Sequence, residues 1–112
     1  MYHAVSFSTL FYAVNAPTAA ADEAAAVLAW VPRGCSALRL DVFSQQENTV
    51  TVTLRNGVVG AMADTALSCA AASGRSCTAT GSVAIAAGSF IDLSVAGASG
   101  NPAGVWTQLE CD

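Results

Sequence analysis

The sequence predicts an all-β fold, a compact β-sandwich or jelly roll of about eight short antiparallel strands. Apolar residues alternate with polar ones along many short stretches, and a period of two puts each set on one face of a sheet. Gly, Pro, Asn and Ser separate these stretches at short intervals, as turns do between strands. The chain has 112 residues, which suits a single jelly-roll domain over residues 1–112.

The N-terminal part is expected to add one strand and one loop to a main sandwich of residues 27–112. The strand lies within residues 1–17, where Val5 to Ala13 alternate and form two fairly apolar faces. Pro17 ends this strand, because proline fixes φ and has no N–H for a sheet ladder. Residues 18–26 are alanine-rich, and we expect a loop with at most one helical turn, since so short a helix is unstable alone.

The stretch from Val31 to Asn56 is expected to organise the fold. Leu38 to Phe43 and Thr49 to Leu54 both alternate, and residues 44–48 between them are polar. A short polar break between two alternating runs is typical of a β-hairpin, so these two strands are predicted to pair. Asn56-Gly57 follows as the strongest turn signal of the chain, because both residues tolerate positive φ.

Further strands and turns are predicted along the rest of the chain. A strand at residues 27–30 ends at Pro32, and turn formers mark a loop at 70–76, a turn at Ala87-Gly88 and a loop at 97–104. The remaining predicted strands lie at 58–59, 66–69, 77–80, 83–85, 91–95 and 105–111. The predicted core consists of the apolar members of three alternating stretches: Leu38, Leu40, Val42, Val50, Val52, Leu54, Ile91, Leu93 and Val95.

Charge is scarce in this chain. Only 11% of the residues are charged, against about 25% in ordinary soluble domains, which suggests that other protein covers part of the surface. The net charge is −4 with four basic residues, all arginine and none clustered, so neither nucleic acid nor an anionic membrane is an expected partner. No apolar run approaches the ~18 residues that span a bilayer. A strand is favoured over a signal peptide at residues 6–16, because no Lys or Arg precedes them.

The four cysteines, Cys35, Cys69, Cys77 and Cys111, form an even set that allows three pairings. Two disulfides are the favoured interpretation, with buried free thiols in a reducing compartment as the alternative. Cys69 and Cys77 flank a short loop of small residues and are predicted to pair across it. The pairing of Cys35 and Cys111 stays open. A zinc site is not expected, because the close C-x-x-C pairs that such sites use are missing.

Catalytic, metal and cofactor sites are not expected. His3 is the only histidine, and a surface or packed position is favoured over a role in a metal site or a catalytic triad. The carboxylates include no calcium loop, and solvated strand faces are favoured over a glycosidase pair. They are Asp22, Glu23, Asp41, Glu47, Asp64, Asp92, Glu110 and Asp112.

The aromatic residues are the candidates for binding. Trp30 and Trp106 are favoured as core or subunit-interface anchors, and a sugar-stacking platform is the alternative, since an exposed indole face suits a pyranose ring. Phe7, Phe11 and Tyr12 lie on the first predicted strand, and one of its two apolar faces is free to meet another subunit. These three residues are therefore the predicted oligomer interface.

Five different segments, spread over residues 27–110, follow one another in the chain: PRGCSALRLDV, TVTVTLRNG, DTALSC, SCTATGSVAIAAGSFIDLSV and VWTQLE. Together they resemble a domain of bacterial and phage surface proteins that is similar to the compact trimeric jelly rolls of the tumour necrosis factor and C1q type. Ser89 stands where the pattern of that domain has Asp, and residues 58–63 lengthen the loop after Asn56-Gly57, so no binding site is transferred. The resemblance implies an exposed, oligomeric module without enzyme activity.

The expected function is structural: a virion-surface protein, as a phage capsid decoration or fibre-head module without catalysis. Its expected partners are two further copies of itself, in a homotrimer, and a major capsid or other virion protein. The alternative is a secreted or cell-surface adhesion module that binds glycans. The host organism and the partner surface do not follow from the sequence.

Overall fold

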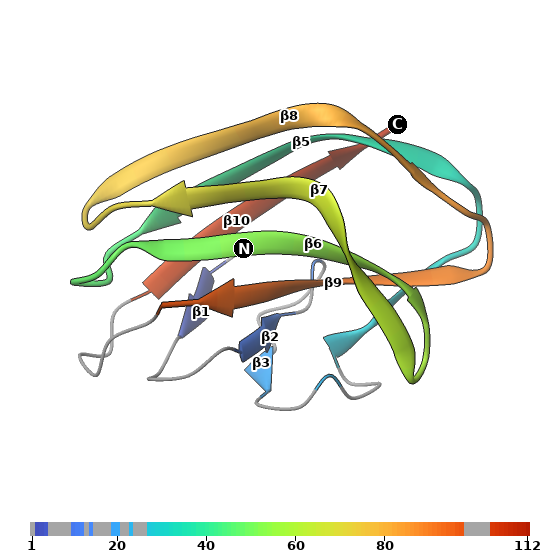
Figure 1. Ribbon diagram of the computed structural model, residues 1–112, viewed down its shortest axis with the longest axis horizontal. Helices are drawn as coiled ribbons and strands as arrows, with labels where there is room; N and C mark the ends of the chain where they lie inside the picture. The colour runs from blue at the N-terminus through green and yellow to red at the C-terminus, as the bar shows by residue number, and fades with distance from the viewer. Residues whose placement is uncertain are drawn as a thin grey trace.

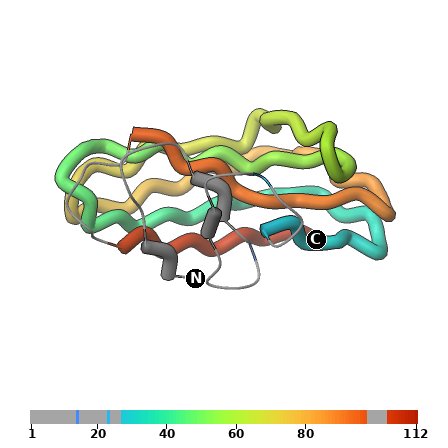
Figure 2. The backbone as a smooth tube through the Cα atoms, turned by 90° about the horizontal axis from the view of Figure 1, so that it is seen from below, coloured from blue at the N-terminus to red at the C-terminus, as the bar shows by residue number. Residues whose placement is uncertain are grey.

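Two antiparallel sheets lie face to face in the computed structural model (Figures 1 and 2), which confirms the predicted all-β sandwich. The structure describes residues 2–4, 10–12, 14, 19–20, 23, 27–97 and 104–112. Ten strands lie in this part of the chain: β1 Tyr2–Ala4, β2 Leu10–Tyr12, β3 Ala19–Ala20, β4 Ala29–Val31, β5 Cys35–Ser44, β6 Val50–Val58, β7 Ala61–Ala71, β8 Arg75–Ile85, β9 Ser89–Ala96 and β10 Gly104–Cys111.

The strand order is that of a jelly roll. Sheet A has the order β1-β10-β5-β8, and sheet B has the order β3-β2-β9-β6-β7, with β4 beside β9. Without the short strands β3 and β4, each sheet has four strands, and every connection crosses between the sheets except the β6–β7 hairpin within sheet B, as in the two Greek keys of a jelly roll. The first and last strands, β1 and β10, are neighbours in sheet A.

The predicted hairpin between the two central strands is wrong. β5 pairs with β10 and β8 in sheet A, whereas β6 pairs with β9 and β7 in sheet B. The polar break is therefore a crossing between the sheets, and Gln46 is buried within it, where its backbone N–H donates to Ser44 Oγ. A period of two shows which face of each strand is apolar, but either pairing or stacking of the two strands can bury those faces.

The predicted turn at Asn56-Gly57 is also wrong, because both residues lie inside β6. The turn follows at Val59-Gly60, where Gly60 has a φ of 84°. The side-chain amide of Asn56 donates to Ser89 Oγ and to the Phe90 carbonyl, which ties β6 to β9. Gly57 allows the backbones of β6 and β7 to approach each other closely, since a Cβ at this position would collide with the Ala61 carbonyl of β7.

Several short predicted strands join into longer ones. The expected strand at 66–69 is part of the eleven-residue β7, and those at 77–80 and 83–85 together form the eleven-residue β8. The predicted turns near Gly74 and Gly88 are confirmed, with φ values of 65° and 81°.

The N-terminal strand prediction is only partly testable. β1 and β2 flank residues 5–9, which lie outside the described part, and they pair in different sheets, β1 with β10 and β2 with β9. Of the alanine-rich stretch 18–26, two residues form β3 and Glu23 is described.

Eight of the nine predicted core residues are buried between the sheets. Leu38 is the exception and is only half-buried, because a bulge between Ala37 and Arg39 shifts the alternation and turns Ala37 inward instead. Further buried apolar residues complete the core: Val27, Ala29, Val31, Ala37, Leu67, Ala71, Ile85 and Val105.

Candidate interaction surfaces

Two disulfides are present, and all four cysteines take part in them. Cys69–Cys77 confirms the predicted pair and links β7, the edge strand of sheet B, to β8, the edge strand of sheet A. Cys35–Cys111 is the pair that the sequence left open, and it joins the neighbouring strands β5 and β10 within sheet A. One bridge therefore holds the two sheets together and the other holds one sheet together.

The inward side chains next to the bridge between the sheets are mostly small. Three further inward positions on β7 and β8 near the bridge are Ala71, Ala79 and Leu67, of which only leucine is large. Small side chains bury little apolar area, so packing alone contributes less stability here than in the centre of the sandwich. A covalent link between the two edge strands offsets that deficit.

An aromatic pair lies on the outer face of sheet A. Trp106 of β10 and Phe43 of β5 are opposite each other, with ring centroids 5.6 Å apart and the rings tilted by 55°. Both remain accessible, at 37% and 38% of their surface. Their neighbours along each strand point inward, which fixes the two rings on the outside. They line a groove of about 750 Å³, the sheet A groove.

Polar side chains continue the sheet A groove beside the rings. Arg39 Nε donates to both carboxylate oxygens of Asp41, at 3.1 and 2.9 Å, and the Thr78 hydroxyl donates to Asp41 Oδ1 at 2.6 Å. The Thr78 hydrogen bond, and with it Arg39, lowers the pKa of Asp41. Gln108 lies opposite Asp41 on β10 and also lines the groove. The charges of Arg39 and Asp41 cancel, so this polar end is neutral.

A second apolar area lies on the outer face of sheet B. Trp30 of β4 is 63% exposed and lies opposite Phe90 of β9. The same row continues across Gly57 to Met62, and the exposed Val58 and Val59 follow at the β6–β7 turn. We call these side chains the sheet B patch: Trp30, Phe90, Met62, Val58 and Val59.

The two tryptophans lie on the outer faces of different sheets, so one sugar chain cannot stack on both. Both are also partly exposed, so neither is a core residue of the single chain. The predicted role of Trp30 and Trp106 as anchors of a subunit interface stays a prediction.

Phe11 and Tyr12 lie in β2, opposite Ser94 and Leu93 of β9.

The remaining predicted interface residue, Phe7, lies outside the described residues, as do the side chains of Phe11 and Tyr12. Their role as an oligomer interface therefore stays a prediction. His3 is in β1, opposite Val105, and its side chain is likewise outside the described part.

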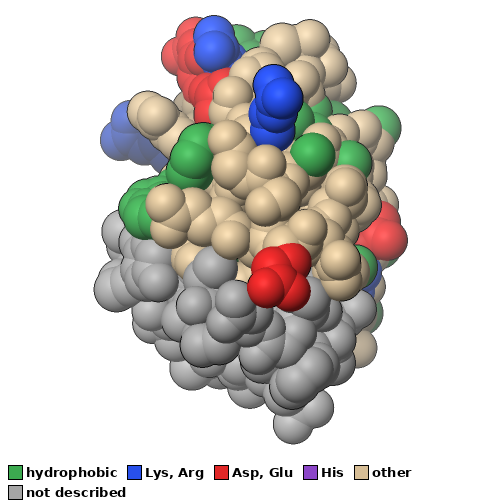
Figure 3. Space-filling view, turned by 90° about the vertical axis from the view of Figure 1, so that its left-hand side faces the viewer, with side chains coloured by type: hydrophobic (Ala, Val, Ile, Leu, Met, Phe, Trp, Pro, Cys, Tyr) green, Lys and Arg blue, Asp and Glu red, His purple; other side chains and the backbone are tan. Residues whose placement is uncertain are grey.

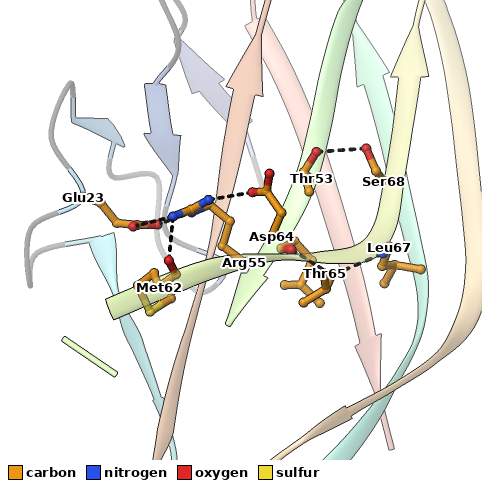
Figure 4. Close-up of polar contacts among 9 residues, drawn as sticks. Glu23, Thr53, Arg55, Met62, Asp64, Thr65, Leu67 and Ser68 are labelled. Atoms are coloured by element: carbon orange, nitrogen blue, oxygen red, sulfur yellow. Dashed lines mark hydrogen bonds and ion pairs between the residues drawn. The ribbon is translucent and has the colours of Figure 1, made fainter. Parts of the chain in front are cut away.

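A charged cluster lies on the outer face of sheet B (Figure 4). Arg55 of β6 donates through Nε to Glu23 at 2.7 Å and through a terminal nitrogen at 3.1 Å. Its other terminal nitrogen donates to Asp64 of β7 at 2.6 Å, and a further bond reaches the Met62 carbonyl at 3.1 Å. Asp92 of β9 is opposite Arg55 in the ladder and is completely buried.

The sequence did not reveal this cluster, because its members come from four separate segments. One signal was available: Asp92 interrupts the apolar run FIDLSV, and a carboxylate in a buried strand needs a compensating partner. The charged residues at Glu23, Arg55 and Asp64 gave no comparable signal, since each lies in an ordinary polar context.

The charged side chains elsewhere on the molecule are few and scattered, as the described residues in Figure 3 show for one end of the sandwich. Among the residues that the structure describes, no group of three or more His, Cys, Asp or Glu residues could hold a metal ion. Within the same residues, no helix is long and apolar enough to span a bilayer.

Comparison with known proteins adds no assignment to these surfaces. No protein-family model matches the chain, and neither a curated protein nor a solved structure matches it.

Proposed function

We propose that this protein is a structural, non-catalytic surface module that works as a homotrimer on a virion, as a phage capsid decoration or fibre-head protein. The observation that carries the proposal is the accessible Trp106–Phe43 pair on the outer face of sheet A. Accessible large aromatic side chains are typical of protein–protein contacts, where they are enriched over the rest of the surface.

The fold supports the choice of sheet A as the subunit contact. The resembled family packs as trimers with one sheet of each subunit turned to the three-fold axis. In this chain, sheet A holds both terminal strands and carries the two rings on its outer face. Only 37–38% of each ring is still exposed, so burying the rest against protein stabilises a contact by roughly 0.5–1 kcal/mol per ring, a fraction of the value for a fully exposed side chain.

A closed ring of three subunits needs a second, different surface that fits the first. The lateral edge formed by β7 and β8, where each strand lacks a second ladder partner among the described residues, has the required properties, whereas the outer face of β8 with Ser76 and Thr78 belongs to the sheet A groove. Both strands are long and largely exposed, and their side chains are mostly Ala, Ser and Thr, with Asp64 and Arg75 as the only charged residues. Small uncharged side chains let a neighbouring sheet face approach closely, so we assign this edge to the sheet A groove of the next subunit.

The sheet B patch is then free to dock on a larger shell. Trp30, Val58 and Val59 are its most exposed members and lie at one end of the sandwich. Three copies on a symmetric lattice bind far more tightly together than one does alone. The partner in this proposal is a capsid or other virion protein, and the two disulfides suit an oxidising exterior.

Light scattering coupled to size exclusion tests the assembly. The wild-type protein is expected to elute at about three times the chain mass of 11.2 kDa. Trp106→Ala should shift the mass to that of a monomer, whereas the matched control Trp30→Ala should keep the trimer. A wild-type monomer at high micromolar concentration, or a trimer that survives both Trp106→Ala and Phe43→Ala, contradicts the proposal.

A glycan-binding adhesion module is the second candidate, because the Arg39–Asp41–Thr78 network lies beside the indole of Trp106. A pyranose stacked on the ring could hydrogen-bond to Asp41 and Gln108, and the cancelling charges of the groove favour a neutral sugar. Tryptophan fluorescence titrated with neutral oligosaccharides tests this candidate. Glycan binding is favoured over the trimer if the wild-type protein is a monomer, neutral oligosaccharides quench its fluorescence to saturation, and the Asp41→Asn variant shows no such quenching.

A further inference from the structure

Asp92 is a buried acid that the proposed assembly does not use. It belongs to the outward-facing row of β9, yet its exposed fraction is 0%. Neither of its carboxylate oxygens has a hydrogen-bond partner among the described residues. An ionised carboxylate in such a place loses its hydration without compensation, so the neutral, protonated form is favoured.

The charged groups around Asp92 come from three elements. Arg55 lies opposite it on β6, Asp64 is the partner of Arg55 on β7, and Glu23 reaches Arg55 from the N-terminal part of the chain. The guanidinium already holds Glu23 through two hydrogen bonds, and Asp64 through a third. With Asp92 protonated, two carboxylates share one guanidinium; with Asp92 ionised, three carboxylates do.

We propose that Asp92 is a proton-operated latch that controls whether Glu23 stays bound to the outer face of sheet B. When Asp92 is protonated, Glu23 keeps its two bonds to Arg55. When Asp92 loses its proton, the new carboxylate competes for Arg55 and repels Glu23, and the Glu23–Arg55 pair separates. Glu23 then no longer ties the N-terminal part of the chain to β6.

The protonation behaviour of the cluster agrees with this geometry. Burial first, and the neighbouring Glu23 carboxyl second, raise the pKa of Asp92 to about 8. A group with a raised pKa in the closed state stabilises that state at low pH, and the stabilisation is lost as the pH rises toward 8. A rise in pH therefore opens the latch.

Opening of the latch is expected to affect β2, which lies close to Asp92 in sheet B. β2 pairs with β9 through Ser94 and its two flanking residues, so Asp92 adjoins the residues that hold β2. The ratio of open to closed molecules should rise by about tenfold for each pH unit between the ordinary pKa of Asp and pH 8, and level off above it. Amide exchange at Leu10–Tyr12 is therefore expected to follow the protonation of Asp92.

Two measurements on the wild-type protein test the latch. Carbon-detected NMR of the Asp92 carboxyl should show a midpoint near pH 8, far above the usual value of about 3.9. Hydrogen exchange from pH 5 to pH 9, corrected for intrinsic rates, should show protection at Leu10–Tyr12 falling with pH. A carboxyl midpoint near pH 4 overturns the proposal even if no variant folds.

Variants separate the latch from general effects of pH. Asp92→Asn mimics the protonated acid and should keep protection at Leu10–Tyr12 constant up to pH 9. Asp64→Asn removes the exposed partner of the same guanidinium and should keep the pH response. A pH response that persists in Asp92→Asn, or one that disappears in Asp64→Asn alone, contradicts the assignment to Asp92.

Discussion

The two disulfides offer the sharpest test of what stabilises this sandwich. Cys69 and Cys77 are 8 residues apart in the sequence, whereas Cys35 and Cys111 are 76 apart. In the chain-entropy model, removing the disulfide that closes the short loop lowers the free energy of unfolding by about 2.5 kcal/mol at 25 °C, and removing the one that closes the long loop lowers it by about 4.5 kcal/mol. Removing Cys35–Cys111 should therefore destabilise the protein more.

The experiment compares two double variants, Cys69→Ala with Cys77→Ala and Cys35→Ala with Cys111→Ala. Alanine is the suitable replacement, because a serine hydroxyl at these half-buried positions would add its own cost of burial. Guanidinium denaturation followed by tryptophan fluorescence gives the free energy of unfolding in each case. Wild-type protein treated with a reductant is the control and should be less stable than either variant.

The two bridges differ in the elements that they connect as well as in loop length. Cys69–Cys77 connects the edge strands of the two sheets, so its removal should also raise amide exchange in β7 and β8 of the folded protein. If its loss costs more than the loss of Cys35–Cys111, the ranking by loop entropy is refuted. The bridge would then act mainly by holding the two edges together in the folded state.

Two further predictions concern single residues. Gly57→Ala should destabilise the protein by about 1–3 kcal/mol in urea denaturation, because its Cβ would collide with the Ala61 carbonyl, whereas Gly81→Ala, with a Leu67 methyl 3.8 Å away, should be nearly neutral. The pKa of Asp41 is lowered in the folded protein, so Asp41 stabilises the fold above its unfolded pKa and this contribution is lost on acidification. This loss of stability should be less than about 1 kcal/mol, because the site is exposed. Urea denaturation midpoints measured between pH 3 and pH 6 should show it in the wild-type protein and not in Asp41→Asn.

The sequence was a good guide to which residues face inward. A period of two identified eight buried positions, because a strand with one polar and one apolar face has a single favourable orientation on a core. Leu38 was the one failure, since a bulge breaks the period without any sign in the sequence. The disulfide between Cys69 and Cys77 was also predictable, because its loop is short and made of small residues.

The sequence was a poor guide to which strands are neighbours. The polar break after Ser44 is compatible with a tight turn or with a crossing between sheets, and only the packing of the whole chain decides between them. The same limit hid the charged cluster, because Glu23 and Arg55 are 32 residues apart. The Trp106–Phe43 pair needed the β10–β5 register, which local patterns do not contain.

The two long edge strands give a physical reason to expect assembly. β7 and β8 have eleven residues each, contain neither proline nor lysine, and carry one charged side chain apiece. Exposed edges of this kind attract other strands, and natural proteins protect them with charge, proline, bulges or a covering segment. Each of these two edge strands has one irregularity in its ladder, opposite Ala37–Arg39 for β8 and opposite Thr53–Arg55 for β7, but little charge and no proline. The Cys69–Cys77 bridge joins the two edges, and neither β7 nor β8 has a ladder partner on its outer side among the described residues. A neighbouring subunit that seats this edge against its own Trp106 and Phe43 would cover the edge and the aromatic pair at once, which is why we place the subunit contact there.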